Sequence, residues 1–374
     1  MMPMPVAPTP SYAVNPLASF YALNIVLILL IVTLGGAWTL ARRRHRTVHD
    51  APAPSVSARR LLTWGLGGLW LLDGLLQAQP FMVTSFVGGF LSPMLPGQPQ
   101  FVARIVDLGM RLWSRDPLLA NFAAAWLQIG IGVLILAGGA SRWRRIGLMA
   151  SVGWGLIVWA AGEAFGSLFS SGSWLSGSPG SALLYVVLAI VLLGPSTWWT
   201  SPHTAGVWRM FLAGLWTVAF VLQVWPHNAW WTARGLSTYV RAMAAMAQPR
   251  VFSAPLWAWS GLLQHHPILW NAGLAAGFLA LALYWALARP SLMGWGLTML
   301  ATFATWMMGQ DFGVLGGMGT DPNSGIVVLL ALVGYAVQVG WLPFATRRGQ
   351  RRENRPLPPA AGRPPQPAHQ RPTG

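Results

Sequence analysis

Two polar side chains inside an apolar segment are the residues that point most directly to chemistry. Asp73 lies within the apolar run 61–79, and Gln77 follows one helical turn later on the same face. A charged carboxylate is costly in a membrane unless it is paired, neutral or open to water. We therefore predict that Asp73 binds an ion, a proton or a polar solute, with Gln77 beside it. The structural alternative is that Asp73 bonds to a neighbouring helix or pairs with an Arg.

Two further acids stand at the ends of apolar runs. Glu163 and Asp311 are each followed within two residues by Phe-Gly, and then by the Gly-rich loops 166–180 and 313–325. Irregular backbone at a membrane edge is stable where it lines a cavity or is buried in protein. We expect these loops to dip back and form the floor of an outward-facing polar pocket, with Gln310 in its lining. The alternative is an ordinary solvated turn beside each acid.

A fourth acid lies in a segment that is typical of a turn. The segment Asp321 to Gly325 has the sequence Asp-Pro-Asn-Ser-Gly, which is typical of a turn followed by a helix start. Hydrogen bonds from Asp321 to the local backbone would be enough to account for an acid at this position, unless Asp321 faces Asp311. Asn323 would add polar lining to the pocket. The candidate residues for binding a solute or ion are Asp73, Gln77, Glu163, Gln310, Asp311, Asp321 and Asn323.

The residue types that the chain lacks exclude several kinds of chemistry. It has no Cys, which excludes disulfides, thiol catalysis and Cys-ligated metal centres, and its 24 basic residues are all Arg, which excludes Lys Schiff bases. The sequence contains no Ser-His-Asp order, phosphate-binding loop or dinucleotide-binding fingerprint. The spacing of His227, His265 and His266 is not diagnostic of a metal site. We assign no catalytic residue, no metal and no cofactor.

The composition is that of a polytopic membrane protein. Of the 374 residues, 54% are hydrophobic and 9% are charged, which does not fit a water-facing surface. Because helices satisfy their own backbone in lipid, we predict an all-α integral membrane protein with about nine transmembrane helices. The runs long enough to cross lie near 18–41, 61–79, 117–140, 146–165, 181–195, 207–225, 267–288, 291–309 and 325–344.

The Arg residues predict the orientation. With the N-terminus outside, 18 Arg lie in cytoplasmic segments and 6 lie outside, as the positive-inside rule favours. The net charge of +16 then belongs to the cytoplasmic face, where it meets anionic lipid, and we predict no nucleic-acid partner. The predicted location is the cytoplasmic (inner) membrane of a bacterium, crossed many times, with the N-terminus out and the C-terminus in.

A repeated unit accounts for most of the chain. An even number of crossings in each unit gives both units the same orientation, so we predict one accessory helix plus two parallel four-helix repeats. The motif pairs, at offsets of 146 to 150 residues, are Leu69-Trp70 with Leu215-Trp216, Leu76-Gln77 with Leu222-Gln223, Asn121 with Asn271, and Gly162-Glu163-Ala164-Phe165-Gly166 with Gly309-Gln310-Asp311-Phe312-Gly313. The predicted segments are an external tail 1–17, an accessory helix with an Arg-rich cytoplasmic loop 18–60, a first repeat 61–206 (the first half), a second repeat 207–345 (the second half) and a disordered tail 346–374.

Each half also contains an amphipathic insert between its first two membrane runs. Apolar residues fall on one helical face of 101–115, and Asp107 and Arg111 are spaced to pair. Residues 235–247 have a similar pattern. We expect both inserts to be helices that lie in the plane of the membrane interface, on the external side.

These motifs resemble a family of uncharacterised bacterial polytopic membrane proteins. The resemblance covers about residues 61–340, and it implies the same helical membrane fold without an assigned activity. Each four-helix unit is also similar in size and layout to DoxX- and MauE-like membrane proteins, some of which are associated with quinone-linked or periplasmic redox systems. The motifs that carry the first resemblance are Trp70-Leu71-Leu72-Asp73-Gly74-Leu75-Leu76-Gln77, Gln79-Pro80-Phe81-Met82, Pro96-Gly97-Gln98-Pro99, Gly162-Glu163-Ala164-Phe165-Gly166 and Thr320-Asp321-Pro322-Asn323-Ser324-Gly325.

Three functions are compatible with these residues. The leading hypothesis is a protein that binds or translocates a small solute or cation through the outward-facing pocket. The alternative is a DoxX-like accessory or redox-partner subunit, in which the helices dock another membrane or periplasmic protein and the acids are structural. An enzyme acting on lipid or quinone would need a base, and Glu163 is the one Glu outside the C-terminal tail.

Overall fold

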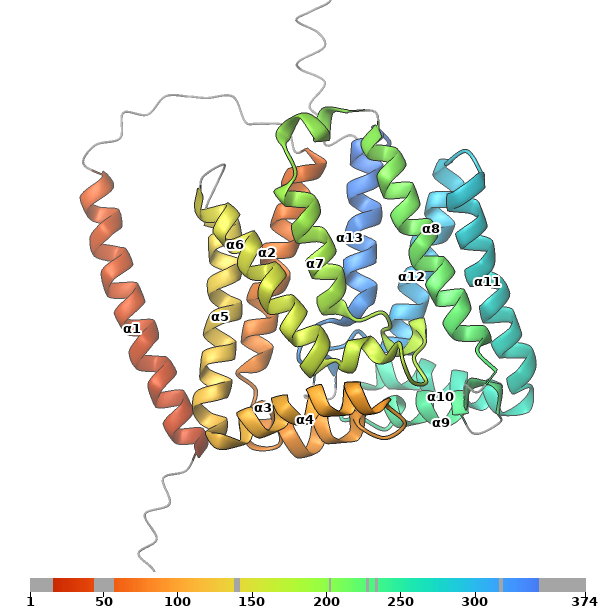
Figure 1. Ribbon diagram of the computed structural model, residues 1–374, viewed down its shortest axis with the longest axis horizontal. Helices are drawn as coiled ribbons and strands as arrows, with labels where there is room; N and C mark the ends of the chain where they lie inside the picture. The colour runs from red at the N-terminus through yellow and green to blue at the C-terminus, as the bar shows by residue number, and fades with distance from the viewer. Residues whose placement is uncertain are drawn as a thin grey trace, which may run out of the picture.

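The computed structural model describes residues 16–43, 57–137, 142–201, 203–226, 229–232, 235–315 and 319–342, and within these ranges the protein is helical, without a β-strand (Figure 1). The predicted all-α class is confirmed. Most of the predicted external tail 1–17, the Arg-rich loop after the first helix, the C-terminal tail 346–374 and His227 lie outside the described residues.

Within the described residues, each predicted apolar run contains a helix. Among the described residues, four helical segments are long and apolar enough to cross a membrane, namely α5 (Pro117–Ala137), Arg142–Gly162, α8 (His203–Val224) and α11 (Pro267–Leu287). The segment Arg142–Gly162 consists of α6 (Arg142–Ile157) and the π-helical turn η3 (Val158–Gly162). The other five runs form α1 (Pro16–Arg43), α2 (Ala58–Gln77), α7 (Ser181–Leu193), α12 (Leu292–Gln310) and α13 (Asn323–Gln338).

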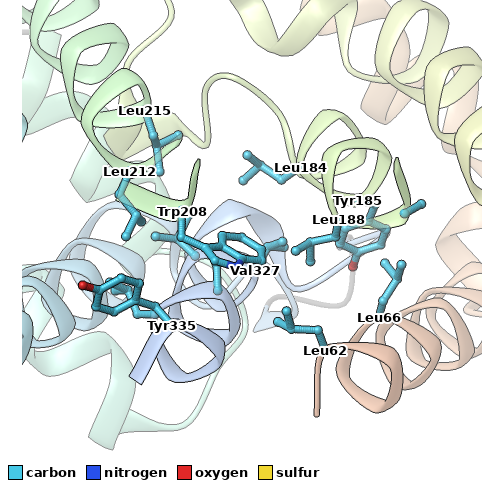
Figure 2. Close-up of a cluster of buried hydrophobic side chains, with 14 of the residues drawn as sticks. Leu62, Leu66, Leu184, Tyr185, Leu188, Trp208, Leu212, Leu215, Val327 and Tyr335 are labelled. Carbon is cyan, nitrogen blue, oxygen red and sulfur yellow. The ribbon is translucent and has the colours of Figure 1, made fainter. Parts of the chain in front are cut away.

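The helices of the two halves share one core. In each half the first two long helices pack together, α2 with α5 and α8 with α11, and α13 contacts α2, α7 and α8. Figure 2 shows side chains of α2, α7, α8 and α13 meeting in a single buried cluster. The contact between the halves is therefore apolar and buried, as in the interior of one domain.

Close contact between α2 and α5 depends on glycine. A Cβ atom on Gly74 would lie 2.6 Å from Ile129 and 2.9 Å from the backbone oxygen of Ala125, and one on Gly132 would lie 2.8 Å from the oxygen of Gly67. Such distances are too short for carbon, so a larger side chain would force the helices apart. Small residues thus set the spacing of this pair.

Helix α1 lies to one side of the other helices and touches the bundle near one end, at α3 and α5 (Figure 1). The Tyr21 hydroxyl donates to the Ala78 oxygen at 3.0 Å, and Trp126 Nε1 donates to Asn24 Oδ1 at 2.8 Å.

Both inserts lie at the same end of the bundle, the lower end in Figure 1, here called the α4/α10 side. The first comprises α3 (Pro80–Thr84), the π-helical turn η1 (Phe86–Leu91) and α4 (Gln100–Arg115), and the second comprises η7 (Ala229–Trp231), α9 (Gly235–Ala244) and α10 (Arg250–His265). The predicted Asp107–Arg111 pair is present at 2.8 Å. Helix α10, which contains Pro255, was not predicted from the sequence.

The same side chains join the same helices in each half. Gln77 Nε2 donates to Asn121 Oδ1 at 2.7 Å between α2 and α5, and Gln223 Nε2 donates to Asn271 Oδ1 between α8 and α11. Each Asn amide in turn donates to the backbone oxygen of its Gln. A polar group buried in this way needs a partner, and here the neighbouring helix supplies it.

Candidate functional site

A cavity of about 380 Å³ lies within the first half, bordered by α2, α4, α5, α6 and α7. Its acidic lining residues are Asp73, Glu163 and Asp321, and its uncharged polar ones are Gln77, Gln128, Ser181, Tyr185 and Thr320. The remaining lining is apolar or aromatic, including Trp70, Phe86 and Trp113. A cavity with a mostly apolar wall and a few polar groups is the usual form of a small-molecule site.

The three acids come from three distant parts of the chain. Asp73 is on α2 and is 3% exposed, Glu163 directly follows η3, and Asp321 is in the loop before α13. Asp73 lies close enough to Asp321 and Glu163 to interact with both electrostatically. The second half of the chain therefore contributes an acid to a cavity in the first half.

Hydrogen bonds hold each acid in place. The Tyr185 hydroxyl donates to Asp73 Oδ1 at 3.3 Å. Glu163 Oε1 accepts from Ser181 Oγ at 2.6 Å and from the Ala182 N–H at 3.1 Å, at the start of α7.

Asp321 is held by its own turn. Its Oδ1 accepts from the Asn323 N–H at 2.6 Å, and its Oδ2 accepts from Thr320 Oγ1 at 3.1 Å. These are the local bonds predicted for a turn, yet the same carboxylate also lines the cavity.

No Arg, Lys or His lines this cavity among the described residues, so its acids have no cationic partner there. Burial, followed by the nearby Asp321 carboxylate, raises the pKa of Glu163 from 4.5 to about 7, against the opposing effect of the bonds from Ser181 and Ala182. Burial also raises the pKa of Asp321. At neutral pH Glu163, beside Asp321, is therefore partly protonated, whereas a free carboxyl group would be fully ionised.

Four polar atoms on the cavity wall are buried and have no hydrogen-bond partner among the described residues. They are Glu163 Oε2, Gln128 Oε1, Trp113 Nε1 and Trp154 Nε1. Buried polar groups in proteins are normally paired, since an unmade bond costs about 1–3 kcal/mol. The set includes both acceptors and donors, and because these atoms have almost no accessible surface, a ligand in the cavity would reach them only if their side chains turned toward it.

Exposed apolar residues form the mouth of the cavity. Leu112 of α4, Leu127 of α5 and Ile157 of α6 line the cavity and are 51%, 41% and 56% exposed. An apolar rim of this kind suits contact with lipid better than contact with water.

Irregular backbone surrounds the acidic end. The π-turns η1 and η3 both contribute lining residues, and such turns occur often at functional sites. Directly after Glu163, Ala164 and Phe165 have φ values of 47° and 58°, a left-handed conformation that is unfavourable for residues with a Cβ. Asp311 and Phe312 repeat it in the second half at 47° and 56°. Strain retained in the same turn of both halves marks these turns as functional candidates.

The structure brings together four of the seven predicted binding residues. Asp73, Gln77, Glu163 and Asp321 line the cavity, whereas Gln310, Asp311 and Asn323 do not.

The other three bond to protein groups outside the cavity. Gln310 Nε2 donates to the Trp174 oxygen at 2.8 Å, Asp311 Oδ2 accepts from Gln248 at 2.8 Å, and Asn323 Oδ1 accepts from the Ser324 N–H at 2.7 Å. Burial raises the pKa of Asp311, against the opposing bond from Gln248.

The residue that matches Glu163 in the second half is Gln310, and Asp311 is one position further on. Glu163 Oε1 accepts from the N–H of the second residue of α7, and Gln310 Oε1 accepts from the Gly325 N–H at 2.9 Å early in α13. Asp311 instead shares its backbone conformation with Ala164. The structure thus agrees with the motif alignment, in which Asp311 is one residue out of step, and this position holds an acid in one half and a neutral amide in the other.

The two Gly-rich loops, which were predicted to form the floor of one pocket, pack in different places. The loop before α13 supplies Thr320 and Asp321 to the cavity, and Gln79 Nε2 donates to its Gly319 oxygen at 2.9 Å. The loop before α7 instead reaches the second half, where the Ser173 hydroxyl donates to Gln223 Oε1 at 2.6 Å. Each loop thus packs on the other half of the chain.

Sequence reasoning missed Tyr185 and Gln128, which line the cavity from α7 and α5. Each is a polar side chain within an otherwise apolar helix, and that signal could have found them.

The described residues contain no group of three His, Cys, Asp or Glu placed to hold a metal ion. Comparison of the chain with protein-family models, with curated proteins and with solved structures found no match. The family resemblance inferred from the motifs stays a prediction.

Proposed function

We propose that this chain is a membrane-embedded binding protein for a small organic cation with an apolar body, such as an ammonium compound. The cation would lie at Asp73, Glu163 and Asp321, and its apolar part would fill the rest of the cavity. The observation that carries this proposal is the presence of three acids, and of no basic residue, in the described lining of one cavity.

A cation is favoured by the electrostatics of the cavity. Three carboxylates in a low-dielectric site repel one another, and a bound positive charge relieves this repulsion while forming charge-assisted hydrogen bonds. Glu163 Oε2 is buried without a protein partner among the described residues and would accept one such bond. Because the cluster holds a proton near neutral pH, binding of the cation would release part of it.

The route of entry that we propose is from the bilayer. The rim residues Leu112, Leu127 and Ile157 are exposed and apolar, so a lipid-soluble amine could pass between α4, α5 and α6 without crossing a polar surface. Its ammonium group would then reach Asp73, Glu163 and Asp321 inside the cavity.

The membrane arrangement that we propose keeps the predicted nine crossings in the cytoplasmic membrane of a bacterium, with the α4/α10 side outside. The 13 residues of α7 extend about 20 Å, which is less than the roughly 30 Å of hydrocarbon. The loop before α7 would therefore lie within the thickness of the membrane, buried by the helices around it. The matched Gln–Asn bonds of α2 with α5 and of α8 with α11 support two parallel repeats.

Binding of the cation is tested by calorimetry in nanodiscs of zwitterionic lipid, with hexylammonium as the probe and 1-hexanol as its neutral analogue. We expect saturable binding of one hexylammonium and no saturable binding of hexanol. Asp73→Asn and Glu163→Gln should each weaken hexylammonium binding at least tenfold. Asp311→Asn is the matched control, because Asp311 lies in the equivalent turn of the second half and outside the cavity.

Equal binding of hexanol and hexylammonium, or unchanged affinity in the Asp73→Asn/Glu163→Gln double variant, would overturn the proposal. Transport is a further prediction, checked by uptake of labelled hexylammonium into vesicles. The accessory-subunit alternative also stays a prediction, and it expects co-purification of a partner protein that the acid substitutions do not alter.

A further inference from the structure

The second half holds one of the chain's own indole rings in its interior. Trp174, at the start of η5 (Trp174–Ser176) in the loop before α7, is 0% exposed. Its ring packs edge-on against Trp216 of α8 at 5.2 Å between ring centres, and its Nε1 donates to Thr305 Oγ1 of α12 at 2.7 Å. The ring is thus held by the helices of the second half, although Trp174 precedes α7 in the chain.

The residues around Trp174 correspond to residues of the cavity wall. Trp216 corresponds to Trp70 at an offset of 146, and Thr305 corresponds to Val158 at an offset of 147. Both Trp70 and Val158 line the cavity of the first half.

A third pair extends the match. Phe278, which stacks on Trp216 with 5.7 Å between ring centres, corresponds to Gln128 at an offset of 150, and Gln128 also lines the cavity. By this correspondence, the indole of Trp174 lies in the second half where the first half has its cavity.

The loop that could fill the first cavity lacks such a ring. Residues 313–320 contain no aromatic side chain, whereas the loop before α7 contains Trp174. The described end of that loop, at Thr320 and Asp321, brings polar groups to the cavity instead.

We propose that the ligand of the first cavity is an aromatic amine, whose planar ring lies against Trp70 as the Trp174 ring lies against Trp216. This inference rests on the proposed function and narrows its substrate class. The aromatic wall supports it, because Trp70, Phe86 and Trp113 offer faces and edges for ring packing.

The two halves also differ in the charge of the residues at matching positions. Ala219 stands in the second half where the first half has Asp73, and Gln310 stands where it has Glu163. A neutral indole needs no counter-charge, so the second half has none at these two positions. Two acids at the same positions of the first half suit a ring that also carries an ammonium group.

The decisive experiment compares 2-phenylethylammonium with 2-cyclohexylethylammonium on the wild-type protein in nanodiscs. The two probes share the same head and differ in ring planarity, and the cyclohexyl compound is the more lipophilic, so partition into lipid opposes the expected order. We expect the aromatic amine to bind at least tenfold more tightly, and Trp70→Leu to reduce that preference to less than threefold.

Equal affinity for the two amines would overturn the aromatic inference and leave the cation proposal standing. Failure of both amines, and of hexylammonium, to bind would overturn the proposed function itself.

A second experiment tests whether the two places are equivalent. The Trp174→Ala variant should have a lower melting temperature than the wild type. Added indole should raise that melting temperature by at least twice the shift that it gives the wild type. The Trp174→Ala/Ala123→Phe variant should keep this rescue, because Ala123 lines the first cavity from an exposed position and its replacement blocks that cavity alone. An indole effect no larger than in wild type would refute the equivalence, and the amine comparison stands even if Trp174→Ala does not fold.

Discussion

The substitution Glu163→Gln should make the protein more stable at alkaline pH and leave it almost unchanged at acidic pH. The amide oxygen can keep both hydrogen bonds that Oε1 accepts, from Ser181 and Ala182, and the amide carries no charge. The same residue type already occupies the matching turn, where Gln310 accepts from the Gly325 N–H. The change therefore removes the ionisation of one buried carboxyl and little else.

The magnitude follows from the pKa of Glu163, which burial and the Asp321 carboxylate raise from 4.5 to about 7. A folded pKa above the ordinary value means that the folded protein binds the proton more tightly than the unfolded chain. This group's contribution is therefore fully present below pH 4.5 and is lost as the pH rises to 7. The difference of about 2.5 pKa units corresponds to about 3 kcal/mol, part of which belongs to Asp321 because the two acids interact.

Thermal unfolding in nanodiscs at pH 5.5 and pH 8.5, followed by circular dichroism, measures the effect. We expect the wild type to lose melting temperature between these pH values, and the Glu163→Gln variant to lose less and to be the more stable protein at pH 8.5. Asp107→Asn is the control, since it removes an exposed pair with Arg111 that contributes little to stability. A Glu163→Gln variant with the same pH dependence as the wild type would refute the reasoning.

Three further outcomes are expected. Binding of hexylammonium at pH 7 should release about half a proton, because a group with a pKa of about 7 is half protonated there, and calorimetry in buffers of different ionisation enthalpy should show this release lost in Glu163→Gln. Asn271→Ala should destabilise the protein by about 1–3 kcal/mol, since it leaves the buried Gln223 amide without its partner, and an unchanged melting temperature would contradict this. Gly74→Ala should lower the melting temperature, because the added methyl group would lie too close to Ile129. Gly68→Ala, on the same helix but with open space around it, should not. Equal effects of the two substitutions would show that α2 and α5 can separate without loss of stability.

The sequence alone determined the fold class and the positions of the helices. A long run of apolar residues in lipid must form a helix, because only a helix satisfies the hydrogen bonds of its own backbone there. This requirement depends on the composition and length of the run more than on distant contacts. Each predicted run contains a helix within the described residues, and the first lies to one side of the others. The acids Asp73 and Glu163 could be named for the same reason, because a carboxylate in or beside an apolar run is costly wherever its neighbours lie.

Tertiary structure decided which acids meet. Asp321 has a complete local explanation as a turn residue, and its place beside Asp73 follows from a loop of the second half that packs on the first. Asp311 had the stronger sequence signal, yet in the structure it bonds to Gln248 outside the cavity. The cavity of the first half is open, whereas at the matching Trp216 of the second half the Trp174 ring packs against the wall. Such outcomes depend on packing between segments about 150 residues apart, which no local pattern of residues encodes.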